Sequence, residues 1–205
     1  MIEIKLIYID DHLDPFLSDY LSDKLEMQLE NVEFKYNDYE FTTPQSNYLS
    51  LVQNETIRES DIIVIDSRLF ENHSIEGEKF TGEEFKVILK LSNPFIEVIV
   101  ISQNDGLEDY GTIKKFRSSR QNDTQDDANL YYERVLLPKV KLSIDKIKQY
   151  RKIVEMMADN KDTFKGGCVL DKVDALINKL PAYKELTDDK INELIDFVKR
   201  ELDLG

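Results

Sequence analysis

The chain contains 205 residues, of which 41% are hydrophobic, so it is long enough to bury a sizeable core in one domain with a small extension. This composition excludes a disordered chain, and no apolar run approaches the ~18 residues of a membrane span. The start lacks the basic and long apolar stretches of a signal peptide, and the single cysteine is Cys168. These features predict a protein of the reducing cytoplasm with no membrane partner.

The formal net charge is −14, and it is concentrated near the N-terminus, where residues 1–66 contain 15 acidic and 4 basic side chains. This excess argues against nucleic-acid binding over most of the surface. It indicates either a cation or a cationic partner near the N-terminal third, or an acidic surface that only keeps the protein soluble.

The first third of the chain alternates between strand and helix patterns. Residues 3–9 are apolar and β-branched and end at Asp10-Asp11, which predicts a buried strand followed by a polar loop. Apolar residues then recur at intervals of three and four from Phe16 to Leu29, which predicts an amphipathic helix. Residues 32–36 alternate like a short strand, and residues 39–47 have the composition of a loop.

The middle of the chain continues this alternation. Two fully apolar runs end at Asp66 and Ser102, as expected of strands that are buried on both faces. Little more than residues 106–111 lies between Ser102 and the next strand pattern, which leaves little room for a helix. The predicted elements are a weak helix at about 46–58, strands at 62–65 and 96–101, a loop at 71–81, a helix at 82–91 and a short strand at 112–114.

Strands that are apolar on both faces and that alternate with amphipathic helices predict parallel strands covered on both sides. The expected fold is therefore a doubly wound, five-stranded parallel α/β sheet with a shortened or missing fourth helix.

The last third of the chain has helical patterns only. A polar stretch over 117–129 precedes apolar spacing typical of one long helix over 130–158, bent at Pro138. We expect a sheet domain over residues 1–160 and a small helical extension over 161–205. The extension is predicted to contain a hinge at 165–167 and two short helices at 168–180 and 188–203.

The carboxyl ends of the predicted strands carry polar side chains that bear on function. In a parallel α/β sheet, ligands bind in the crevice outside these ends. Three carboxylates are expected to converge there, and carboxylates in close proximity repel one another and favour a hard divalent cation such as Mg²⁺. The residues at the strand ends are Asp10, Asp11, Asp66, Ser102 and Lys114.

Four segments of the sequence resemble, in this order, the receiver domain of two-component response regulators: IYIDDH, DIIVIDSRLF, VIVIS and TIKKF. The resemblance covers roughly residues 1–160 and implies a flavodoxin-like fold. It also implies that a sensor histidine kinase or a phosphotransfer protein supplies a phosphoryl group in a phosphorelay. The signal would then pass through contacts with an output protein, whose identity the sequence leaves open, or through a homodimer.

The resemblance also implies a role for each strand-end residue. Asp66 would be the phosphoacceptor, a carboxylate nucleophile that forms an acyl phosphate while the cation offsets charge on the transferred group. A lysine would act as a point charge on the phosphoryl oxygens. The implied set is Mg²⁺ ligation by Asp10, Asp11, Asp66 and the main-chain carbonyl of Arg68, a hydrogen bond from Ser102 to the phosphoryl group, and pairing of Lys114 with it.

The sequence also departs from the family pattern. Lys115 stands where the family usually has proline, so the usual cis peptide is not expected, because a non-proline cis bond costs ~2.5–4 kcal/mol. Adjacent strand residues face opposite ways, so only one of Lys114 and Lys115 can reach the site, and the motif favours Lys114. Gly111 occupies the place of the switch aromatic, with Tyr110 beside it. The missing helix removes much of the surface by which receivers dimerise or signal.

These departures leave two alternatives open. The first is a receiver-like interaction module that keeps the fold but does not depend on phosphorylation. The second is a Mg²⁺-dependent phosphohydrolase, which is less favoured because Ser67-Arg68 stands where a second acid or base would follow Asp66.

A basic segment lies in the predicted long helix, where Arg134 to Lys152 include seven basic residues and one acidic residue. We interpret it as a solvated helix face, or as a complement to the acidic third of this or another subunit. Nucleic acid is not an expected partner, because the final two helices lack the length and basic face of a DNA-binding output domain.

Overall fold

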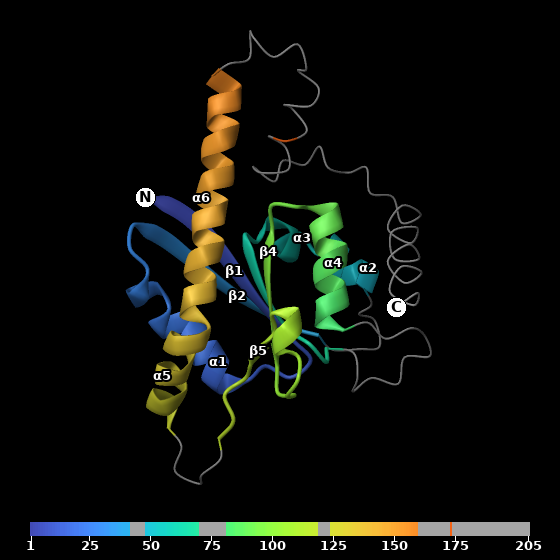
Figure 1. Cartoon of the computed structure of the whole chain (residues 1–205), viewed down its shortest axis with the longest axis vertical. Coiled ribbons are helices and arrows are strands. Elements are labelled where there is room, and N and C mark those ends of the chain that lie inside the picture. The colour runs from blue at the N-terminus through green and yellow to red at the C-terminus, as the bar shows by residue number, and fades with distance from the viewer. Residues whose placement is uncertain (42–47, 70–80, 119–123, 160–172, 174–205) are drawn as a thin grey trace.

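The computed structural model describes residues 1–41, 48–69, 81–118, 124–159 and 173. Its centre is a five-stranded, all-parallel sheet in the order β2-β1-β3-β4-β5, with helices on both faces (Figure 1). This confirms the predicted doubly wound architecture. The strands are β1 (Ile2–Asp10), β2 (Val32–Glu40), β3 (Ile62–Asp66), β4 (Glu97–Ser102) and β5 (Ile113–Lys114).

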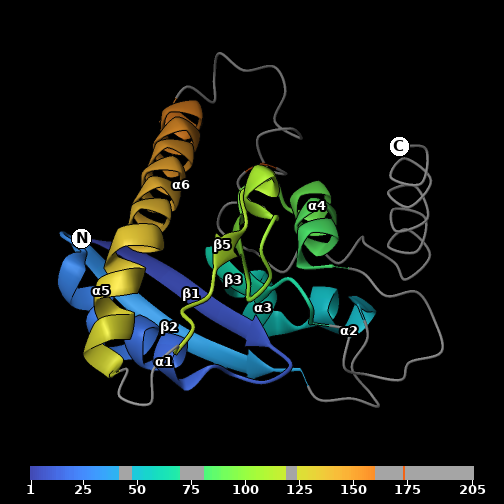
Figure 2. The ribbon, with the colours of Figure 1, turned by 60° about the horizontal axis from the view of Figure 1, so that its bottom comes forward.

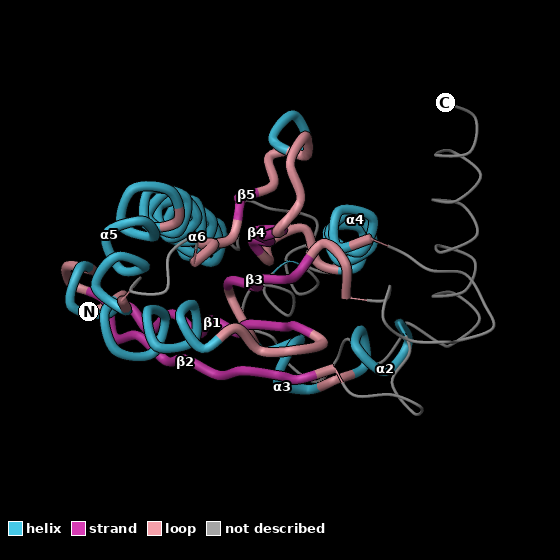
Figure 3. Tube along the Cα trace, turned by 90° about the horizontal axis from the view of Figure 1, so that it is seen from below, coloured by secondary structure: helices cyan, strands magenta, loops and turns pink. Residues whose placement is uncertain are grey.

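Two helical layers cover the sheet (Figures 2 and 3). One face carries α1 (Pro15–Asp19), α5 (Gln125–Val135) and α6 (Leu137–Asp159), and the other carries α2 (Tyr48–Gln53), α3 (Glu55–Glu59) and α4 (Gly82–Ser92). Seen from below, α5 and α6 lie to the left of β4 and β5, and α4 lies to the right (Figure 3).

The strand side chains divide between two hydrophobic cores. Tyr8 and Val64 belong to the first core, beneath α1, α5 and α6, whereas Ile9 and Ile65 belong to the second, beneath α2, α3 and α4. Because successive side chains of a strand point to opposite faces, this division fixes the face on which every strand-end residue lies. All residues of β3 and β4 are buried, as expected of central parallel strands.

The edge strand β2 is longer than predicted. It pairs with β1 over its full length, from Ile2 opposite Val32 to Asp10 opposite Glu40. Its last residues are polar and largely exposed, so they have no apolar alternation and resemble a loop in the sequence. Main-chain hydrogen bonds to β1 continue the strand where the side-chain pattern ends.

The predicted long last helix is present as α6, with 23 residues, but the stretch expected as one helix over 130–158 also includes the end of a separate helix, α5. Thr124 and Asp127 form a capping box that starts α5 at Gln125, within a stretch predicted to be polar loop. The break falls at Leu136, two residues before the predicted bend at Pro138. Proline disfavours helical geometry in the residue before it, but it is tolerated in the first turn of a helix. Pro138 is accordingly the second residue of α6.

Two other predicted helices are also divided. The helix expected from Phe16 to Leu29 consists of α1, a π-helical turn (Tyr20–Lys24) and a 3-10 turn (Glu26–Gln28). The weak helix near 46–58 is divided into α2 and α3 at Asn54, whose side chain accepts the Ile57 N–H and caps α3.

The connection from β4 to β5 contains a single 3-10 turn (Glu108–Tyr110), which confirms the shortened fourth helix. Gly111 ends this turn at φ +77°, a left-handed conformation that glycine adopts without steric cost. No helix among the described residues is long and apolar enough to cross a membrane. The extension predicted over 161–205, with its hinge and two helices, lies outside the described residues apart from residue 173.

Candidate functional site

The strand ends place the predicted polar residues at one edge of the sheet. Asp10 ends β1, Asp66 ends β3 and Ser102 ends β4, with exposed fractions of 1%, 6% and 1%. Asp11 follows β1 in a half-buried position. The carboxyl ends of three neighbouring strands therefore supply two buried carboxylates and a buried hydroxyl.

Lys115 supplies the positive charge at this edge. Its Nζ lies 2.6 Å from Asp10 Oδ2 and 2.7 Å from Asp66 Oδ1, and the side chain is 5% exposed. Its main-chain N–H donates to the carbonyl oxygen of Ser102 at 2.7 Å, which continues the pairing of β5 with β4. One ammonium group thus joins the ends of β1 and β3 to the end of β5.

The prediction that Lys114 reaches the carboxylates is wrong. Lys114 forms an ion pair with Asp105 at the surface. Sheet register explains the difference, because Asp66, Ile101 and Ile113 stand opposite one another and share a face. Lys115 is two residues beyond Ile113 and shares its face, whereas Lys114 stands opposite Ser102 and points the other way.

Each carboxylate accepts further hydrogen bonds. Asp10 Oδ2 also accepts the hydroxyl proton of Tyr8, and Asp66 Oδ2 accepts the Arg68 main-chain N–H at 2.6 Å. Tyr8 was missed as a site residue because it resembles a core aromatic of β1. Its position two residues before Asp10, on the same face of the strand, was the available signal.

The charges of the site shift its pKa values. Burial raises the pKa of Asp66 above its ordinary value, and the charge of Asp10 adds to this, while Lys115 and the Arg68 N–H oppose it. Burial alone would lower the pKa of Lys115, but the charges of Asp66 and Asp10 raise it. Lys115 therefore stays an ammonium ion, and the group of three side chains carries one excess negative charge when both carboxyls are ionised.

The expected convergence of three carboxylates is only partly met. No group of three Asp, Glu, His or Cys side chains among the described residues is close enough to hold a metal ion, so Asp11 does not join the other two. Two carboxylates nevertheless fit Mg²⁺ in kind, because this ion is commonly held by one or two carboxylates with waters and phosphate oxygens. Lys115 contacts both carboxylates, so a cation can bind between them only if the ammonium releases one carboxylate.

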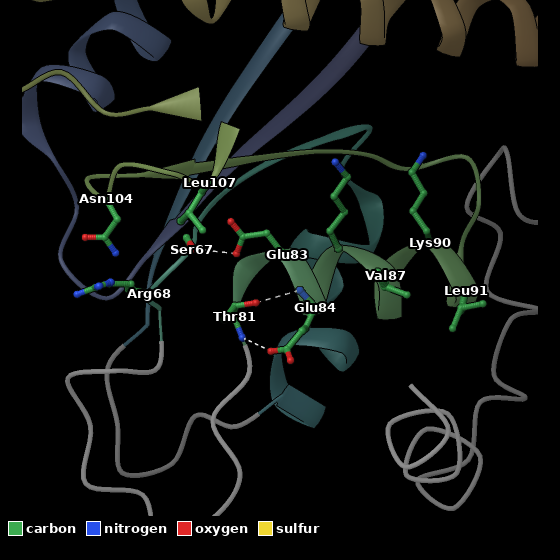
Figure 4. Close-up of a pocket in the computed structure, with 11 residues that line it drawn as sticks. Ser67, Arg68, Thr81, Glu83, Glu84, Val87, Lys90, Leu91, Asn104 and Leu107 are labelled. Atoms are coloured by element: carbon green, nitrogen blue, oxygen red, sulfur yellow. Dashed lines mark hydrogen bonds between the residues drawn. The ribbon is translucent and has the colours of Figure 1, made fainter. Parts of the chain in front are cut away.

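A second polar contact joins α4 to the turn at residues 67–69, which follows Asp66 and is called the Asp66 turn. Glu83, in the first turn of α4, accepts the Ser67 hydroxyl at 2.7 Å (Figure 4). It also accepts the Thr112 hydroxyl at 2.6 Å. Gly82 N–H donates to the Ser67 carbonyl at 2.9 Å. Glu83 therefore joins the residue after Asp66 to the start of β5. Sequence reasoning missed this residue because its partners are remote in the chain.

A largely apolar groove extends from this contact along α4, with a volume of about 750 Å³ (Figure 4). Val87 and Leu91 of α4 and Leu107 of the β4–β5 connection contribute its apolar side chains. Ser67 and Arg68, which follow Asp66 directly, form its end nearest the site. We call it the α4 groove.

Neither a scan against protein-family models nor a search of curated proteins finds a match to this chain. The fold itself is decided by topology, because the strand order 2-1-3-4-5 in an all-parallel sheet with helices on both faces defines one architecture. The fold is flavodoxin-like. In flavodoxin-like folds, ligands bind outside the carboxyl ends of the strands, which is where Asp10, Asp66 and Lys115 lie.

Lys115→Met tests the ion group that Lys115 forms with Asp10 and Asp66. It leaves two buried carboxylates without their counter-charge, and we expect the free energy of unfolding to fall by about 3–5 kcal/mol in urea titrations at neutral pH. The loss should shrink as the pH falls, because burial raises the pKa of the Asp66 carboxyl, so the folded variant takes up a proton there before the unfolded chain does. Lys114→Met, which removes a surface pair, should change little. Equal effects of the two substitutions would contradict the bridging position of Lys115.

Gly82→Ala tests the packing of α4 against the Asp66 turn. A β-carbon at position 82 would lie 2.5 Å from the Asp66 carbonyl oxygen and 3.0 Å from the Ser67 α-carbon, and both are main-chain atoms. We expect the free energy of unfolding to fall by about 1–3 kcal/mol through overpacking. Val87→Ala on the exposed side of α4 is the matched control. A loss of stability no larger than in this control would show that the main chain after Asp66 shifts without a measurable cost.

Proposed function

We propose that this chain is a receiver-type signalling domain whose Asp66 accepts a phosphoryl group. The observation that carries the proposal is the contact between Lys115 and Asp66 at the carboxyl end of the central strand β3. A nucleophilic carboxylate paired with a lysine, at the ligand-binding edge of a flavodoxin-like sheet, suits transfer of a phosphoryl group. The resemblance of IYIDDH, DIIVIDSRLF, VIVIS and TIKKF to receiver segments supports the same function.

The proposed reaction is an in-line transfer to a carboxylate. An oxygen of Asp66 forms a bond to phosphorus, and the bond from phosphorus to the donor's nitrogen or oxygen breaks, with its electron pair leaving on the donor. Asp66 Oδ1 is held by Lys115 and Oδ2 by the Arg68 N–H. Lys115 would then exchange its contact with Asp66 for the new phosphoryl oxygens, which keeps negative charge beside its ammonium.

A Mg²⁺ ion held by Asp10, Asp66 and the main-chain carbonyl of Arg68 would supply charge neutralisation at the transferred group. In this proposal Asp10 has a second role, because its contact with Lys115 keeps the ammonium at the site when the lysine releases Asp66. Tyr8, through its hydrogen bond to Asp10, orients that carboxylate. The phosphodonor would be a histidine kinase or a phosphotransfer protein, and the product would signal through contacts with another protein.

A specific observation favours a second candidate, the interaction module that does not depend on phosphorylation. Lys115 already contacts both buried carboxylates, so its charge reduces their summed charge to −1 without any ligand. Ser102 Oγ accepts the Asn104 N–H at 3.1 Å, and Gly111 cannot provide an aromatic switch. In this candidate the ion group is structural only.

Incubation of the full-length chain with acetyl phosphate and Mg²⁺, followed by intact-mass measurement, separates the two candidates. We expect one phosphoryl adduct on the wild type and none on Asp66→Asn, because the amide is not a nucleophile of this kind. Asp105→Asn, which changes an exposed aspartate near the site, is the matched control and should still form the adduct.

Absence of an adduct on the wild type, together with no binding of beryllofluoride, would overturn the proposal in favour of the interaction module. An adduct that persists in Asp66→Asn would place the phosphoacceptor elsewhere. Rapid turnover of phosphoesters without any adduct would favour a hydrolase instead.

A further inference from the structure

Two adjacent tyrosines of α5 bind the main chain on either side of Lys115. The Tyr131 hydroxyl donates a hydrogen bond to the Lys114 carbonyl oxygen at 2.8 Å. The Tyr132 hydroxyl oxygen accepts the Phe116 main-chain N–H at 3.1 Å. Lys115 lies between these two contacts and carries the ammonium of the ion group. The two hydroxyls therefore restrain the stretch of main chain from which the Lys115 side chain extends.

The main-chain groups that the tyrosines bind lie on the outer edge of the sheet, because β5 is its last strand. Along a strand, the main-chain groups of successive residues point to opposite sides. The Lys115 N–H points to β4, where it donates to the Ser102 carbonyl oxygen, so the Lys114 carbonyl and the Phe116 N–H point away from β4. A further strand would normally bind such groups. Here the two tyrosine hydroxyls bind them instead.

Ring contacts fix the positions of both hydroxyls. The Phe116 ring packs against Tyr131 at a centroid distance of 5.8 Å and against Phe16 at 5.6 Å. The Tyr132 ring packs against Tyr131 at 5.4 Å and against Tyr20 at 5.4 Å. Aromatic pairs at these separations stabilise one another beyond the burial of their area. Because the rings are packed in this way, the hydroxyls have little freedom to move.

Helix α5, which carries the tyrosines, is held by contacts that do not involve β5. Thr124 and Asp127 form the capping box at its start. The Gln125 side-chain amide donates to the carbonyl oxygen of Phe16, just before which α1 begins, at 2.9 Å. At the other end of α5, Leu136 is buried in the core beneath α1, α5 and α6. The tyrosines therefore restrain the end of β5 from a helix that is fixed independently.

Both tyrosines keep their hydroxyl protons at neutral pH. Burial raises the pKa of Tyr132, and the charge of Asp14 raises it further. Burial also raises the pKa of Tyr131, although the charges of Lys114 and Arg134 oppose this. The Tyr131 hydroxyl therefore remains a donor to the carbonyl oxygen, and the Tyr132 hydroxyl remains a neutral acceptor.

We propose that Tyr131 and Tyr132 are positioning residues, which hold the main chain at Lys115 so that its ammonium reaches the proposed phosphoacceptor. A lysine side chain is flexible, so the direction of its main chain limits where its nitrogen lies. The consequence for phosphoryl transfer rests on the proposed function, because a charge fixed in advance beside the reacting oxygens lowers the barrier. The positioning itself can be measured on the ion group without any phosphoryl transfer.

Tyr131→Phe and Tyr132→Phe test this role, because each removes one hydroxyl and keeps the ring. The first measurement follows the side-chain nitrogen of Lys115 in the full-length chain by heteronuclear NMR at neutral pH. In each variant its signal should shift, and its ammonium protons should exchange with water about tenfold faster than in the wild type. The second measurement is the rate at which acetyl phosphate and Mg²⁺ form the adduct on Asp66, which should fall about tenfold.

Tyr20→Phe is the matched control. Tyr20 is fully buried and packs on Tyr132, but its hydroxyl has no hydrogen-bond partner within the described parts of the chain. Removal of this hydroxyl should change neither measurement. Ile144→Val shortens a buried side chain of α6 in the same core, so it controls for a general loss of stability. It should also leave both measurements unchanged.

A Lys115 signal and proton exchange that stay as in the wild type in both tyrosine variants would overturn the proposal. Changes of equal size in Tyr20→Phe or Ile144→Val would also overturn it, because they would show a general effect of stability. An unchanged rate of adduct formation beside an altered ammonium would overturn the role in phosphoryl transfer. If the wild type forms no adduct, the proposed function fails, whereas an altered ammonium in the tyrosine variants alone still supports the positioning.

Discussion

The ammonium of Lys115 between the buried carboxylates of Asp10 and Asp66 is the interaction on which the carboxyl edge of the sheet depends. Removing an ion from water costs several kcal/mol, so two buried carboxylates side by side require a counter-charge with good geometry. Lys115 provides it from beyond the end of the shortest strand, β5. The same contact therefore secures the edge of the sheet and places a lysine on the proposed phosphoacceptor.

The Asp66 turn connects two surfaces of different character. On one face of the sheet its carboxylate belongs to the ion group with Lys115 and Asp10. On the other, the next residue, Ser67, is bound by Glu83 and by the start of α4, where Gly82 leaves no room for a β-carbon. Any change in the contacts of the Asp66 carboxylate would therefore occur next to the first turn of α4 and the groove beside it. Because the β4–β5 connection contains a single 3-10 turn, no helix of the described residues follows β4 on the side of this groove.

Much of the fold could be predicted from the sequence because its central strands are apolar on both faces and end in acidic or hydroxyl residues. The edge strand β2 and the start of α5 could not, because main-chain pairing and a capping box extend them through polar stretches. At the site, Asp10 and Asp66 could be predicted because they stand at the ends of apolar strands. The choice of Lys115 over Lys114 depends on the register of β5 against β4. The required clue was Ile113, whose core position fixes the face of Lys115. Tyr8 and Glu83 depend on contacts that no local pattern encodes.

The charge state of Lys115, followed through its side-chain nitrogen by heteronuclear NMR, tests this account most directly. Because the charges of Asp66 and Asp10 raise its pKa, the account predicts that Lys115 remains an ammonium ion above the ordinary lysine pKa of 10.5, with slow exchange of its protons with water. Its signal should respond when Asp66→Asn or Asp10→Asn removes one carboxylate. A Lys115 that titrates at or below the ordinary value, or whose protons exchange as fast as those of surface lysines, would contradict the buried ion group.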